Sequence, residues 1–314
     1  MRPVAALLSL SLLVVAGCAP AGSEPAAAPP TDRQWPAFEQ RAAEVADAWR
    51  PGPQWRDGYV PLQEPTVLAG DPGFSPDTLT AFQAGWYRDQ IPLPADRPGD
   101  GTIRFPGGTL TVPLASAEEA YRQLDQGDPP TCDGRPKDPA TPPPAQPSGP
   151  DAPMSSTPGS ACIPLTVTGV ELGSVPIRTS RGEAEVPAWL FTIDELTARV
   201  ARLAVAPTAV GAVPQPTAPA APLPAEVVGA QDLRAVDGAT LTVRLGVGAC
   251  DTGITPLVLE RDDLVVVGGG VTRSTGPCPD VLKIEPVTVT LRAPLGARPV
   301  LDVNTGLPLR ITPF

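Results

Sequence analysis

Residues 175–191 read Val-Pro-Ile-Arg-Thr-Ser-Arg-Gly-Glu-Ala-Glu-Val-Pro-Ala-Trp-Leu-Phe. Apolar and polar residues alternate on both sides of Ser180-Arg181-Gly182-Glu183, a pattern that is typical of two strands joined by a turn. Because Pro176 and Pro187 have no backbone N–H for a strand ladder, we expect this hairpin to lie at a sheet edge or to contain bulges. The stretch predicts a β-meander over residues 162–206.

The segments on either side of the meander have different patterns. Residues 32–127 combine helical spacing of apolar residues with short extended runs, which predicts an α+β module. Residues 227–314 contain several short strand-like runs separated by turn residues, as in a small sandwich or barrel. The expected fold class is therefore α+β and predominantly β. A helix-containing N-terminal module would be followed by the β-meander and a small C-terminal β-sandwich or barrel-like module.

Three helices are expected in the N-terminal module. The first begins near Pro36 and the second at Ser75, each with proline in the first turn. The third begins at Ser116, where Ser-Ala-Glu-Glu has the form of a capping box. Residues 103–112 alternate like a hairpin, whereas residues 192–205 fit either a helix or a turn between strands.

Proline-rich stretches divide the chain. Residues 18–31, 128–161 and 207–226 consist mainly of Pro, Ala, Thr, Ser and Gly. Such composition favours extended or polyproline II conformations over a packed core. We expect a spacer, a disordered loop and a linker, in that order.

Residues 1–17 have the features of an export signal. A positively charged start precedes an apolar run that is too short to cross a bilayer, and small residues precede Cys18. Residues 15–18, Val-Ala-Gly-Cys, resemble the lipobox of bacterial lipoproteins. This resemblance implies cleavage before Cys18 and a diacylglyceryl lipid on its thiol, so that the membrane is a partner through a covalent lipid. We expect the protein to be exported and anchored to the outer face of the cytoplasmic membrane.

The charge balance and the absence of histidine exclude several classes of function. The chain has 23 basic and 34 acidic residues, a net charge of −11, and lacks the positive surface that nucleic-acid backbones require. It contains no histidine, which removes histidine-based catalytic triads, general bases and metal ligands. We therefore expect no nucleic-acid partner, no metal, no cofactor and no enzymatic activity.

Four cysteines remain besides Cys18. An even number in an exported protein suggests two disulfides, and three pairings are possible. The sequence-local pairing joins Cys132 to Cys162 and Cys250 to Cys278. Each bond would close a loop of about 30 residues and stabilise the fold by about 3–4 kcal/mol.

Most of the aromatic residues lie in the N-terminal module. The candidates for a stacking surface that binds a sugar or a peptide are Trp49, Trp55, Tyr59, Trp86 and Tyr87. The alternative, which we favour, is that these side chains form the core of that module. Arg181, at the hairpin turn, is a candidate for anion recognition, although hairpin tips are commonly polar because they face water.

Residues 265–270, Val-Val-Val-Gly-Gly-Gly, superficially resemble a strand that leads into a phosphate-binding loop. No GxGxxG or Walker pattern follows. We therefore expect a bulge or a wide turn at these glycines.

Two stretches resemble segments of actinobacterial secreted lipoproteins of unassigned function. They are residues 175–191 and residues 293–302, the latter reading Ala-Pro-Leu-Gly-Ala-Arg-Pro-Val-Leu-Asp. The resemblance assigns no catalytic residue to any position. The function expected is a non-enzymatic envelope lipoprotein that acts in interaction or scaffolding, with an envelope protein or the cell wall as partner. The alternative is an extracytoplasmic module that binds a wall glycan, a peptide or a small solute.

Overall fold

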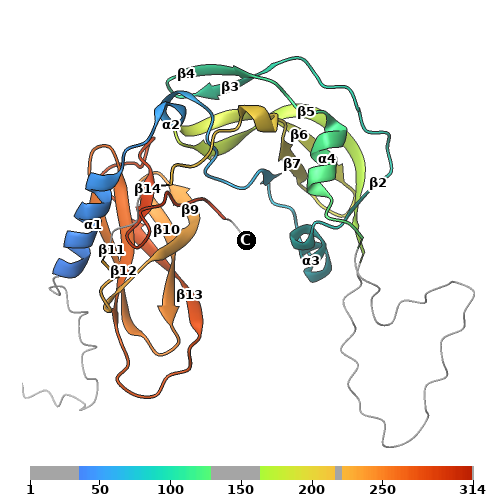
Figure 1. The fold of residues 1–314 in the computed structure, drawn as a ribbon. Helices are drawn as coiled ribbons and strands as arrows, with labels where there is room; N and C mark the ends of the chain where they lie inside the picture. Colours follow the sequence, from blue (N-terminus) through green and yellow to red (C-terminus); the bar gives the residue numbers. More distant parts are fainter. Residues whose placement is uncertain (1–34, 129–162, 216–220, 313–314) are drawn as a thin grey trace, which may run out of the picture. The chain divides into compact units, whose positions relative to one another are not determined.

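The computed structural model describes residues 35–128, 163–215 and 221–312, which belong to one compact unit, Trp35–Phe314 (Figure 1). Strands predominate, and the predicted fold class, α+β and predominantly β, is confirmed. The predicted signal peptide, the lipid site at Cys18, the spacer and almost all of the stretch 128–161 lie outside the described residues.

The larger sheet contains seven strands in the described residues. They are β1 (Thr66–Ala69), β2 (Tyr87–Asp89), β3 (Gly101–Phe105), β4 (Gly108–Val112), β5 (Leu165–Thr179), β6 (Gly182–Ile193) and β7 (Arg199–Leu203). Their order is β1-β7-β6-β3-β4, and β5 pairs with both β6 and β2. The predicted meander is therefore present as β5, β6 and β7. Because β1 to β4 join the same sheet, the boundary drawn between residues 32–127 and 162–206 does not separate two sheets.

The two prolines of the hairpin lie where no ladder donor is needed. Pro176 lies in the part of β5 whose only partner among the described strands is β6, and an isolated bridge between Pro61 and Thr179 follows beyond it, so this part is a sheet edge. Pro187 lies in β6, which has neighbours on both sides. Its second neighbour changes there, because β7 pairs with Ala188–Phe191 and β3 pairs at Glu185. The edge position predicted from the prolines therefore holds for β5, whereas β6 is an interior strand.

The described helices are α1 (Pro36–Ala48), α2 (Pro53–Asp57), α3 (Pro76–Ala84) and α4 (Ala117–Leu124), with a 3-10 turn, η1 (Pro207–Ala209). The three predicted helices begin at the expected residues, as α1, α3 and α4, and a short helix, α2, was not predicted. In α4 the Ser116 hydroxyl accepts from the Glu119 N–H at 3.1 Å, and the Glu119 carboxylate accepts from the Ser116 N–H at 3.2 Å. Residues 192–205, for which two alternatives were open, form a turn followed by β7.

Residues 227–311 contain two smaller sheets. One has the order β13-β10-β9, from β9 (Ala230–Asp237), β10 (Thr240–Gly248) and β13 (Leu282–Thr290). The other comprises β8 (Val227–Val228), β11 (Thr252–Glu260), β12 (Val265–Thr272) and β14 (Val300–Asp302). Side chains from both sheets, such as Leu245 and Val267, form one buried core. The small sandwich expected from the sequence is present.

A disulfide joins Cys250 to Cys278, with a Cα–Cα distance of 6.0 Å. It connects the turn after β10 to the loop before β13. This half of the predicted pairing is confirmed. The other half, Cys132 to Cys162, lies outside the described residues.

The first helix covers the C-terminal sandwich. Phe38, Val45 and Trp49 pack with Val266 of β12 in one buried cluster, and α1 lies beside β11 and β12 in Figure 1. The glycines at 268–270 lie inside β12, so the predicted wide turn is wrong, although the register of β12 with β11 shifts between Gly270 and Thr272. Close packing explains them, because a side chain on the last of the three would collide with the ring of Trp35.

Candidate functional site: an arginine-lined hollow

The aromatic residues proposed as a stacking surface belong to two separate cores. Trp49, Trp55, Tyr59 and Tyr87 are only 7%, 5%, 1% and 3% exposed, and Trp86 is partly buried. The two tyrosines and Trp86 pack with the seven-stranded sheet, whereas Trp49 and Trp55 pack with α1 and β12. The five side chains therefore do not form a common surface.

Three of the six candidate residues nevertheless line one hollow. Trp49, Trp55 and Arg181 border a hollow of about 830 Å³ in the unit Trp35–Phe314. Its other walls come from the turn between β5 and β6, the turn between β3 and β4, and the loop at residues 294–299. A volume of this size is typical of sites for small molecules.

The β5–β6 turn is fixed by hydrogen bonds on both sides. The Thr179 hydroxyl donates to the Gly182 carbonyl at 2.7 Å and accepts from the Arg181 N–H at 3.1 Å. The Ser180 hydroxyl donates to the Trp55 carbonyl at 2.7 Å. Gly182 has a φ of 93°, in the region that favours glycine. The tip that carries Arg181 is therefore a defined structure.

Three guanidinium groups line the hollow and contact mainly backbone carbonyls. Arg178 donates to the carbonyls of Gly296 at 2.5 Å and Arg298 at 2.9 Å. Arg181 donates to the Asp57 carbonyl at 3.2 Å, and its guanidinium carbon lies 3.8 Å from the centroid of the Phe105 ring. Arg56 donates to a carbonyl of its own segment, that of Pro51 at 3.1 Å.

Within the described part of the chain, Arg56, Arg178 and Arg181 form no ion pair with a carboxylate at 4 Å or less. Carbonyl partners orient a guanidinium without neutralising it. Two acidic residues, Glu183 and Asp263, also border the hollow. Three cations against two anions give this site a positive balance in a chain whose net charge is −11.

Arg56 is exposed, whereas Arg181 and Arg178 are half-buried. Burial lowers the pKa of Arg178 to about 10, while the Glu183 charge acts in the opposite direction. The group therefore stays protonated at neutral pH. An anion that enters the hollow would meet a half-buried cation, where charge–charge attraction is stronger than at a fully exposed surface.

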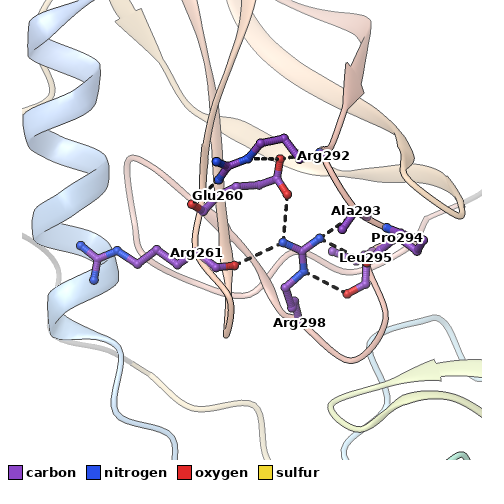
Figure 2. A network of polar contacts seen from close by, with 7 residues as sticks. All are labelled: Glu260, Arg261, Arg292, Ala293, Pro294, Leu295 and Arg298. Atoms are coloured by element: carbon purple, nitrogen blue, oxygen red, sulfur yellow. Dashed lines mark hydrogen bonds and ion pairs between the residues drawn. The ribbon is translucent and has the colours of Figure 1, made fainter.

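One wall of the hollow is held by Arg298 (Figure 2). Its guanidinium pairs with the Glu260 carboxylate at 3.0 Å, and Figure 2 shows it surrounded by carbonyl oxygens. These are the carbonyls of Ala293, Pro294, Leu295 and Arg261, at 2.9, 3.2, 3.3 and 3.2 Å. The same loop presents the Gly296 carbonyl to Arg178. The network therefore fixes the backbone that orients a cation of the hollow.

The Glu260 carboxylate is kept ionised by its partners. Burial acts to raise its pKa, but hydrogen bonds from the Arg292 N–H and the Arg298 guanidinium, with the charges of both arginines, leave the pKa below its ordinary value. The Arg292 N–H lies 2.7 Å from the carboxylate. The Glu260 and Arg298 side chains are 7% and 14% exposed, which shields the pair from solvent.

The sequence pointed to only part of this site. Arg181 was singled out because it lies at the hairpin tip, whereas Arg178 and Arg56 were not. Arg178 lies three residues earlier in the same stretch, on the strand that leads to the turn. Its role depends on the carbonyls of residues 296 and 298, which no local pattern connects to β5.

Among the described residues, no group of three or more Asp, Glu or Cys side chains is arranged to hold a metal ion. In the same residues no helix is both long and apolar enough to span a bilayer. Comparison with protein-family models, with curated proteins and with solved structures found no match for this chain.

Proposed function

We propose that the chain is a non-enzymatic, lipid-anchored envelope protein that binds an organic anion in the arginine hollow, the site bordered by Arg56, Arg178 and Arg181. The observation that carries the proposal is the gathering of three guanidinium groups without carboxylate partners in one hollow. The hollow favours the ligand-binding alternative over a purely scaffolding role.

The lining residues define the chemistry of the ligand. Guanidinium groups recognise carboxylate and phosphate through charge-assisted hydrogen bonds. Trp49, Trp55 and Phe105 offer apolar surface beside them. A small ligand with one acidic group and an apolar body complements both features. The Ser180 hydroxyl is already bonded to the Trp55 carbonyl, which supports a binding role rather than nucleophilic chemistry.

The proposed location follows from Cys18 and from the disulfide. A diacyl lipid on Cys18 would hold the protein at the outer face of the cytoplasmic membrane. The Cys250–Cys278 bond supports an oxidising, extracytoplasmic compartment. Metabolic labelling with palmitate tests the anchor: we expect label in the wild-type chain and none in Cys18→Ala, and equal labelling of the two would contradict it.

Tryptophan fluorescence tests the ligand site, because Trp49 and Trp55 border the hollow. Phenylacetate and phenylacetamide have the same apolar body and differ in charge. We expect saturable quenching by phenylacetate that weakens with added salt, and little response to phenylacetamide. Equal responses to the two compounds, or none to either, would overturn the proposal.

A pair of variants locates the binding. Arg178→Gln removes a half-buried cation of the hollow, and we expect about a tenfold loss of phenylacetate affinity, the effect of one charge-assisted hydrogen bond. Arg234→Gln is the matched control, because Arg234 is exposed on β9 and does not border the hollow. Its affinity should equal that of the wild type.

A further inference from the structure

A second hollow, of about 520 Å³, lies where the ends of α3 and α4 meet β1 and β7. Three glutamines, Gln83, Gln123 and Gln126, border it, together with Tyr87 and Arg202. We call this site the amide hollow. It shares no lining residue with the arginine hollow.

Two buried polar atoms at this site have no hydrogen-bond partner. In the described residues, four buried side-chain polar atoms are without one, and the Tyr87 hydroxyl and Arg202 Nε are two of them. Tyr87 is only 3% exposed. Buried polar groups in folded proteins almost always have a partner, so each exception requires an explanation such as a missing water or ligand. The two residues that carry these atoms border the same hollow.

Arg202 is held in place by its two terminal nitrogens, while its buried Nε has no partner. Its Nη1 donates to the Thr66 hydroxyl at 2.8 Å, and its Nη2 donates to the Gln123 side-chain oxygen at 3.0 Å. Thr66 is also its cross-strand neighbour in the β1–β7 pair. The guanidinium is therefore oriented before any ligand arrives, and Nε remains unpaired. Such preorganisation reduces the entropic cost of binding.

Gly85 fixes the ends of α3 and α4 at this hollow. This residue follows α3 with a φ of 70° and caps the helix in the left-handed conformation. Its carbonyl accepts from the Gln126 N–H at 2.7 Å, which joins the end of α3 to the end of α4. A β-carbon at this position would collide with the Gln126 side chain. The two helix ends can therefore approach closely enough to enclose the hollow.

The lining is polar without a net charge. It contains one cation, Arg202, and one anion, Glu64. The Glu64 carboxylate lies 3.8 Å from the Arg310 guanidinium and also acts against the pKa-lowering effect of burial on Arg202. The amides of the three glutamines both donate and accept hydrogen bonds, as the hydroxyl groups of a sugar do. Phe82 adds an apolar face.

We propose that the amide hollow binds a neutral sugar, with the Tyr87 hydroxyl and Arg202 Nε as its buried hydrogen-bonding groups. The site is independent of the anion proposed for the arginine hollow. A neutral ligand follows from the balanced lining, and a ligand rich in hydroxyl groups follows from the amides and from the two atoms that need partners.

Calorimetric titration of the protein with glucose and with N-acetylglucosamine tests the proposal. We expect saturable binding of at least one of the two sugars to the wild type. In Tyr87→Phe that affinity should fall about five- to tenfold, the effect of one neutral hydrogen bond. Removal of an unpaired buried hydroxyl should leave the Tm of the sugar-free protein unchanged or higher. Loss of binding in a fully stable variant therefore marks a ligand contact.

Tyr59→Phe is the matched control. Its hydroxyl is also buried and unpaired, and the residue is 1% exposed, but it borders neither hollow. Its Tm should respond like that of Tyr87→Phe, and its sugar affinity should not change. The proposal is overturned if neither sugar binds the wild type, or if Tyr87→Phe binds as the wild type does. Phenylacetate binding, measured on the same samples, reports separately on the arginine hollow.

Discussion

Two groups of arginines, one that supports the wall of the arginine hollow and one that lines the hollow, are held in different ways. Arg298 and Arg292 share the Glu260 carboxylate, whereas Arg178 and Arg181 contact only carbonyls and an aromatic ring. A guanidinium paired with a carboxylate is electrically satisfied and stabilises the fold. One held by carbonyls is oriented but keeps its charge for another partner. The difference separates structural arginines from the arginines that we propose to bind an anion.

The largest effect on stability is expected from the replacement of Arg298, which pairs with Glu260. Arg298→Ala removes the ion pair with Glu260 and the hydrogen bonds to four carbonyls, and it leaves the shielded Glu260 carboxylate with Arg292 alone as its partner. We expect the free energy of unfolding to fall by about 3 kcal/mol, as it does when one partner of a buried ion pair is removed alone. Urea denaturation measures this change.

Arg199→Ala is the control for Arg298→Ala. Arg199 pairs with Glu171, but both side chains are largely exposed, and exposed pairs contribute about 0–1 kcal/mol. The free energy of unfolding should therefore change little. Equal destabilisation by the two substitutions would remove the distinction between a structural network and a surface ion pair.

A smaller change in the free energy of unfolding is expected at acidic pH. The pKa of Glu260 is lower in the folded protein than in the unfolded chain, so its carboxylate stabilises the fold above the ordinary glutamate pKa of about 4.3. This contribution is lost as the pH falls through the lower, folded-state pKa. In urea denaturation at a series of pH values, the advantage of the wild type over Glu260→Gln should shrink below about pH 4. A difference that stays constant through this range would contradict the assigned role.

The smallest effect on stability is expected from the replacement of Arg181, which lines the hollow. Arg181→Gln loses its contact with the Phe105 ring, which contributes about 0.5–1 kcal/mol at an exposed site. Thermal unfolding should therefore shift little, while phenylacetate affinity falls about tenfold. A large loss of stability with unchanged affinity would place Arg181 among the structural arginines.

The elements that the sequence predicted are those whose signals are local. The turn at residues 180–181, the capping box at Ser116 and the turn-separated strands of the sandwich each depend on a few neighbouring residues. The packing of α1 on β12 depends instead on a side chain at Trp35 meeting glycine at 270, and a single sequence does not reveal that pairing. Because that contact is not visible in the sequence, the glycines of β12 suggested a turn.

The candidate site was even less visible in the sequence, because its parts are far apart in the chain. Arg56 comes from α2, Arg178 from β5 and the orienting carbonyls from residues 296 and 298. Arg298 lies in a stretch whose resemblance to secreted lipoproteins carried no role. Only the fold shows that it holds the wall of the hollow.

The central claim is that the unpaired arginines of the hollow bind an organic anion. Calorimetric titration of phenylacetate and phenylacetamide into the wild type and into Arg181→Gln tests it most directly, because the four affinities separate recognition of charge from recognition of the apolar body. We expect that the substitution weakens phenylacetate binding about tenfold and leaves phenylacetamide binding unchanged. Equal weakening of both compounds, or of neither, would contradict it.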